Sequence, residues 1–158
     1  MNLFSDCLIQ ESKAIKNAAQ NLDPIEVQKA LELILRCSKL NGKLIITGVG
    51  KSGIVARKIA ATFSSVGLMS IYLNPLNALH GDLGVAQKND LSILLTNSGE
   101  TKELIEIIPH LKKRGINIIT ILGRKDSNIS KQSNVILETS VDKEICPLNL
   151  APTASTAV

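Results

Sequence analysis

A short glycine-rich segment, GVGKSG at residues 48–53, has the residue types that hold an anion. Glycine lets a backbone approach a ligand closely, as Gly50 could here, and free N–H groups at a helix start attract negative charge. Lys51 adds a positive charge, and Ser52 stands where an N-cap or a hydroxyl ligand belongs. The segment therefore predicts a phosphate-binding turn. Glycines that merely join a strand to a helix are the alternative for this motif taken alone.

Two nucleotide-binding interpretations of the same turn lack support. The dinucleotide fingerprint Gly-x-Gly-x-x-Gly matches, but it needs an acidic residue about 20 positions later, at the end of the second strand. The predicted second strand, 69–73, is followed by Asn74 and Pro75. A nucleotide P-loop needs a glycine where this chain has Ile45, inside the first strand.

A second loop of the same kind follows the predicted strand at 91–95. The hydroxyls of Thr96, Ser98 and Thr101 surround Gly99 at a predicted helix start, again an anion-holding arrangement. Two such loops at one edge of a sheet favour a phosphate site over plain helix capping. Because neither loop carries the Walker lysine–threonine pair or Mg²⁺ ligands, the phosphate should belong to a small molecule.

Acid–base chemistry could come from a histidine between these loops or from a glutamate beside them. His80 lies in the glycine-flanked segment LHGDLG, where a histidine can serve as an acid or a base, with Asp82 placed to orient it. A histidine that only caps or fills the loop is the alternative. Glu100 and Glu103 fall in a predicted first helical turn, where the dipole favours acids anyway. One of them can be purely structural and the other a base aimed at the crevice, whereas His110 has no expected chemical role.

These loops need a scaffold of alternating strands and helices. Short apolar runs predict strands at 43–47, 69–73, 91–95, 116–121 and 134–138, and helical spacing predicts helices near 53–66, 75–80, 100–113 and 126–132. Two more helices come first, over residues 3–20 and from Asp23-Pro24 to about Ser38. The pattern implies a parallel sheet covered on both faces, in the doubly wound order 2-1-3-4-5. Pro109 should kink or divide its helix.

Composition bounds the class of protein. The chain of 158 residues fits one domain, and 44% hydrophobic with 20% charged residues indicates a globular fold. A net charge of +4 and only three aromatic side chains argue against a nucleic-acid partner. No apolar run reaches the ~18 residues of a membrane span and no signal peptide opens the chain, so we expect no membrane association and a cytoplasmic location. The three cysteines are odd in number and widely spaced, so the sequence predicts neither a disulfide framework nor a metal site.

Four segments in a fixed order resemble the sugar isomerase (SIS) domain, specifically its arabinose-5-phosphate isomerase branch. They are GVGKSG, NALHGDLG, TNSGET and CPLNLAPTAST, and the similarity runs from about Gly42 to Ala157. The resemblance implies an α/β/α sandwich of flavodoxin-like strand order that binds phosphosugars and interconverts ribulose 5-phosphate and arabinose 5-phosphate. It further implies a homotetramer without an organic cofactor, acting in lipopolysaccharide biosynthesis.

The same resemblance assigns roles to residues. Those it assigns to catalysis are Lys51, His80 and Glu103. The phosphate site, predicted from the loops and the resemblance together, comprises Gly50, Ser52, Thr96, Ser98, Gly99 and Thr101. A family histidine in a Ser-His-Pro-Gly stretch, the long helix after Thr153 and the CBS pair have no counterpart here. We therefore expect a single SIS domain over 1–158, with N-terminal helices at about 1–40, a core at about 42–158 and an incomplete C-terminus.

The expected reaction is aldose–ketose isomerisation through an enediol, an intramolecular oxidoreduction of a sugar phosphate. Glu103 or His80 would act as the base, and Lys51 would stabilise the developing oxyanion. The alternative is a non-catalytic, phosphosugar-binding or regulatory module. A dehydrogenase domain is a third interpretation, disfavoured by the missing ribose-binding acid.

Overall fold

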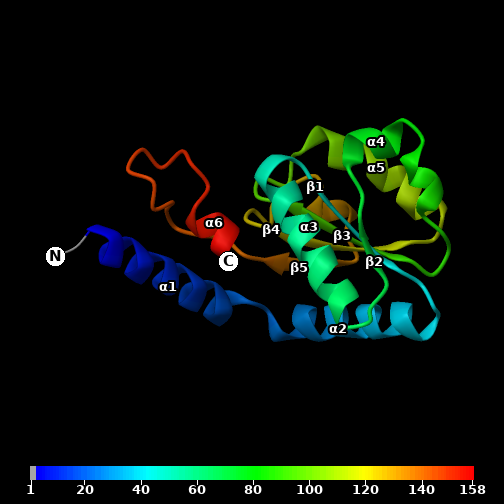
Figure 1. Cartoon of the computed structure of the whole chain (residues 1–158), viewed down its shortest axis with the longest axis horizontal. Helices are drawn as coiled ribbons and strands as arrows, with labels where there is room; N and C mark the ends of the chain where they lie inside the picture. The colour runs from blue at the N-terminus through cyan, green and yellow to red at the C-terminus, as the bar shows by residue number, and fades with distance from the viewer. Residues whose placement is uncertain (1–2) are drawn as a thin grey trace.

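A five-stranded parallel sheet in the order β2-β1-β3-β4-β5 organises the computed structural model, which describes residues 3–158 (Figure 1). Its strands are β1 Leu44–Gly48, β2 Ser70–Tyr72, β3 Leu91–Thr96, β4 Asn117–Leu122 and β5 Val135–Glu138. Every pairing between neighbours is parallel. The predicted doubly wound order is confirmed, and the winding direction reverses between β1 and β3.

Helices cover both faces of the sheet, which makes the predicted three-layer sandwich. They are α1 Leu3–Asn21, α2 Pro24–Lys39, α3 Gly50–Ser65, α4 Pro75–Leu79, α5 Lys102–Lys113 and α6 Ala154–Ala157, with 3₁₀ turns η1 Asp82–Val85 and η2 Ser130–Gln132. On one face α2 and α3 pack against Ile46 and Ile93, and on the other α4 and α5 pack against Ile45 and Leu94. Both faces of β1 and β3 are thus buried, which explains why these strands read as continuous apolar runs.

The first loop differs from its prediction, because α3 begins at Gly50 instead of Gly53. Gly50 has a φ of +59°, so the chain already turns into the helix directly after Val49. Val49 is the N-cap and makes no side-chain capping bond, so the prediction of Ser52 as an N-cap is wrong. Gly53 serves packing instead, since a Cβ there would lie 2.7 Å from the Gly48 carbonyl oxygen.

Two further helix predictions differ from the structure. Of the kink or division predicted at Pro109, the division is wrong, because α5 runs unbroken from Lys102 to Lys113. A proline costs a helix about 3 kcal/mol, but each fully buried aliphatic side chain recovers about 1.5–3 kcal/mol. The helix buries such side chains at Leu104, Ile107, Ile108 and Leu111.

The helix expected at 126–132 is only the short turn η2. Ser130 accounts for the difference, because its hydroxyl donates to the carbonyl oxygens of Lys125 and Ser127. Serine side chains that bond the local backbone in this way compete with regular helix.

The N-terminal helix α1 is present as predicted, but it lies outside the sandwich. In Figure 1 it extends away from the sheet beside the C-terminal segment, and it contacts α6. Among the helices within residues 3–158, none is long and apolar enough to cross a bilayer.

Candidate phosphate-binding site

The loops after β1 and β3 lie side by side at the carboxyl edge of the sheet, as predicted. The strand register pairs Gly48 with Leu95, so the residues that follow each strand leave the sheet at the same point. Lys51 and Ser52 from the first turn of α3 meet Thr96 and Asn97 around a cavity of about 330 Å³. This is the switch point of a doubly wound sheet, where such folds bind ligands.

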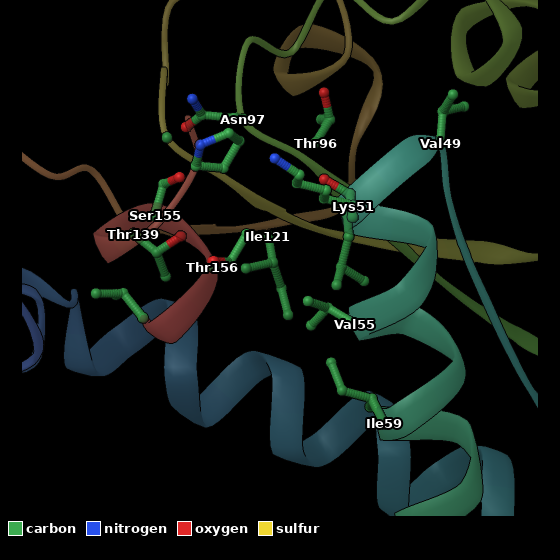
Figure 2. A pocket seen from close by; sticks show the side chains of 15 residues that line it. Val49, Lys51, Val55, Ile59, Thr96, Asn97, Ile121, Thr139, Ser155 and Thr156 are labelled. Carbon is green, nitrogen blue, oxygen red and sulfur yellow. The ribbon is translucent and has the colours of Figure 1, made fainter. Parts of the chain in front are cut away.

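The cavity has a polar rim and an apolar floor. Figure 2 shows Lys51 on α3 facing Ser155 and Thr156 of α6, with Thr96 and Asn97 beside them. The floor consists of Val55, Ile59, Leu95 and Ile121. Helix α3 supplies both parts, because its first turn reaches the rim while Val55 and Ile59 lie one and two turns further along.

Hydrogen bonds within the second loop hold its hydroxyls in place. The hydroxyls of Thr96 and Thr101 are 2.8 Å apart, and the Gly99 N–H donates to the Thr96 hydroxyl at 3.2 Å. The Ser98 hydroxyl accepts from the Glu100 N–H at 3.1 Å while its side chain stays exposed. Each hydroxyl retains hydrogen-bonding capacity for a ligand, so the loop is pre-organised.

A neighbouring loop at residues 123–130 braces this arrangement. The Gly123 N–H donates to the Asn97 carbonyl oxygen and the Ile129 N–H to that of Gly99, both at 3.1 Å. Gly99 has a φ of +68°, and a Cβ there would lie 2.1 Å from the hydroxyl of Ser127. Only glycine therefore fits at position 99.

Glu100 belongs to this brace. Its carboxylate accepts the N–H of Asn128 at 2.9 Å and the side-chain amide of the same residue, and Arg124 lies 3.9 Å away. The hydrogen bonds from Asn128 lower the pKa of Glu100 below its ordinary value, with a smaller contribution from Arg124. Of the two glutamates left open by the sequence, Glu100 has the structural role.

The predicted acid–base residues stand apart from the cavity. Glu103 is half-buried in the first turn of α5, and His80 is exposed at the C-cap of α4. These two helices pack together on the face opposite α3. Of the predicted site residues, Lys51, Ser52 and Thr96 line the cavity. Gly50, the first residue of α3, and the loop residues Ser98, Gly99 and Thr101 lie beside it, while His80 and Glu103 lie in the α4–α5 layer.

Sequence reasoning missed four polar lining residues. They are Asn97, Thr139, Ser155 and Thr156. The last two belong to the segment CPLNLAPTAST, which carried the family resemblance but received no role of its own. Within residues 3–158, no group of three or more His, Cys, Asp or Glu side chains is arranged to hold a metal ion.

Fold and site together define a class: a doubly wound α/β domain with a lysine- and hydroxyl-rimmed cavity at its switch point. Comparison with known proteins makes the assignment specific. The SIS domain family model matches residues 34–158, so the chain belongs to the SIS domain family.

Three relatives illustrate the likeness. Arabinose 5-phosphate isomerase KpsF of Escherichia coli is 42% identical over 151 residues, which cover 96% of this chain and 45% of KpsF. A crystal structure from Listeria monocytogenes superposes with a TM-score of 0.92 at 34% identity, covering 98% of this chain and 80% of that one. An Escherichia coli protein in complex with arabinose 5-phosphate superposes with a TM-score of 0.90 at 36% identity, covering 100% of this chain and 85% of that one. The chain spans about half the length of the curated relatives it matches.

Proposed function

We propose that this protein is an aldose–ketose isomerase that interconverts D-ribulose 5-phosphate and D-arabinose 5-phosphate. The observation that carries the proposal is the convergence of Lys51, Ser52 and Thr96 on one cavity at the switch point of the sheet. The similarity to KpsF and to a protein bound to arabinose 5-phosphate supports the choice of substrate.

The phosphate would bind between the two helix-starting loops. Free N–H groups at the starts of α3 and α5 and the hydroxyls of Ser52, Ser98 and Thr101 suit a dianion, and Lys51 adds a positive charge. Binding energy from the phosphate would then position the reacting end of the sugar.

Isomerisation requires one proton to move between neighbouring carbons. From the ketose, a base would take a proton from C1 while the carbonyl oxygen at C2 gains one, which gives the enediol. The C1 hydroxyl then loses its proton as C1 becomes the aldehyde, and C2 receives a proton. Lys51 would stabilise the negative charge that develops on oxygen.

Glu103 or His80 would be the base. The position of Glu103 favours it, because it lies two residues after Thr101, whose hydroxyl is bonded to Thr96 of the cavity. His80 stands further along the same helical layer, at the end of α4.

Assembly, place in metabolism and location form part of the same proposal. Large apolar side chains are exposed on α1, α2 and the C-terminal segment, among them Leu8, Leu35, Leu148 and Leu150. They support a homo-oligomer, with a tetramer as the expected state. We further expect a single domain without an organic cofactor, acting in the cytoplasm on a lipopolysaccharide precursor.

The direct test is incubation with ribulose 5-phosphate followed by NMR identification of the product. We expect arabinose 5-phosphate at equilibrium with the ketose, and in D₂O one deuterium per molecule at C2. Binding of either sugar phosphate without conversion would favour a non-catalytic, regulatory module. Reduction of a nicotinamide cofactor would instead revive the dehydrogenase interpretation.

A further inference from the structure

The C-terminal segment forms a long excursion that the proposed reaction has not yet used. After β5 the chain leaves the sheet, passes beside α1 and returns to the cavity as α6 (Figure 1). We call residues 140–157 the strap. It contains the CPLNLAPTAST segment, and its returning end places Ser155 and Thr156 on the cavity wall opposite Lys51.

One carboxylate closes the strap at its base. Oε2 of Glu144 accepts three hydrogen bonds: from the Thr153 N–H at 2.8 Å, the Thr153 hydroxyl at 3.0 Å and the Ser155 N–H at 3.2 Å. Residues 144 and 153 are thereby held together across the loop. The same loop is tied twice more, because the Ile145 N–H donates to the Thr153 hydroxyl and the Glu144 N–H to the side chain of Asn149, both at 2.8 Å.

These contacts determine where the cavity residues stand. Ala154, between the two bonded residues, is fully buried and anchors the start of α6. Ser155 and Thr156 follow directly, so a shift of the strap base would move both side chains relative to Lys51. Because the first turns of α3 and α5 would hold the phosphate, hydroxyls on the opposite wall are placed for the sugar chain.

We propose that Glu144 is a positioning residue that fixes Ser155 and Thr156 against the hydroxyl groups of the bound sugar phosphate. The inference rests on the proposed function for the identity of the ligand. Glu144 acts on that ligand only through the strap.

Glu144 is poorly suited to be the base itself. Partial burial on its own would raise the pKa of Glu144, but hydrogen bonds from Ser155 and Thr153 outweigh this effect and hold it below the ordinary value. A carboxylate with a lowered pKa and an oxygen already bonded to three donors is a weak proton acceptor.

The test compares Glu144→Gln with a double variant, Ser155→Ala with Thr156→Ala, and with the triple combination. Contacts to sugar hydroxyls act in the ground state and the transition state alike, so KM for arabinose 5-phosphate should rise about tenfold with kcat within about threefold. The triple variant should be no worse than the double, because all three changes remove the same contacts. Glu144→Asp should recover part of the affinity. Glu32→Gln, on the exposed surface of α2, is the matched control.

Three readouts separate this inference from the proposed isomerase activity. Exchange of the Thr153 and Ser155 amide hydrogens without ligand should be at least about tenfold faster in Glu144→Gln. Unchanged exchange would show that Glu144 does not hold the base of the strap. Additive losses in the triple variant, or a fall in kcat alone, would overturn the positioning role. If the unmodified chain binds arabinose 5-phosphate by calorimetry without converting it, the isomerase proposal fails, and weaker binding by Glu144→Gln still supports the strap. Absence of binding would overturn both.

Discussion

The two edges of the sheet use polar residues in opposite ways. At the amino edge Asp90 is buried and accepts from the Lys43 N–H at 2.9 Å, the Lys43 ammonium at 2.6 Å and the Gln87 N–H at 2.7 Å. At the carboxyl edge Lys51 and Ser98 are exposed beside a cavity or loop that can receive an anion. Polar groups that satisfy one another hold a fold together, whereas those with remaining capacity at a concave surface indicate a ligand.

This contrast predicts that substitutions at the carboxyl edge change activity without changing stability, and that those at the amino edge do the reverse. The largest effect should come from Glu103→Gln. Loss of the base should lower kcat by roughly 10²–10⁴-fold while leaving the melting temperature and arabinose 5-phosphate binding intact. Glu106→Gln, exposed on the same helix, is the control. Full activity in Glu103→Gln together with a dead His80→Ala would transfer the role to the histidine.

Lys51→Met should have the second-largest effect on activity. The variant keeps the unbranched side chain, one atom shorter, and loses its charge, so kcat/KM should fall by roughly 10²–10³-fold with little change in unfolding. Steady-state kinetics and urea denaturation measure the two quantities. Lys58→Met, exposed further along α3, should behave like the unchanged chain, and an equal loss in both variants would point to a general charge effect.

Asp90→Ala tests the amino edge. It leaves the ammonium and two N–H groups without their shared acceptor, and should lower the free energy of unfolding by about 3 kcal/mol. The protein that remains folded should retain its kcat. Asp126→Ala removes an exposed ion pair with Lys131 and should cost at most about 0.5 kcal/mol. An unchanged melting curve for Asp90→Ala would contradict the claim that the polar groups at the amino edge stabilise the fold.

Glu100→Gln should have the smallest effect on activity. It lies between the substitutions that change activity and those that change stability. It loosens the brace to Asn128 without removing a ligand, so KM should rise only about threefold while kcat holds. A pH series sharpens the result. Because the pKa of Glu100 is lowered on folding, its contribution is present above the ordinary value of 4.5 and is lost as pH falls through the lowered value. Urea midpoints measured from pH 6 to pH 3 should therefore decline less steeply in Glu100→Gln.

Local chemistry made most of the scaffold predictable. The apolar runs of β1 and β3 act within a few residues of themselves, so the strands, the sheet order and the presence of a glycine turn after β1 could be predicted, although the start of α3 within that turn could not. The predictions that were wrong also rested on local rules, but packing or side-chain hydrogen bonds outweighed those rules. Buried neighbours keep α5 whole at Pro109, and the Ser130 hydroxyl replaces a helix with a short turn.

The sequence by itself determined that this chain builds a doubly wound parallel sheet with two hydroxyl-bearing loops at its switch point. Only the tertiary structure decided which polar groups remain open to a ligand and which are bonded within the protein. Lys43 and Asp90 are 47 positions apart, and Glu100 and Asn128 are 28 apart. A hydrogen bond depends on distance in space, and residue type and spacing along the chain carry no record of such partners.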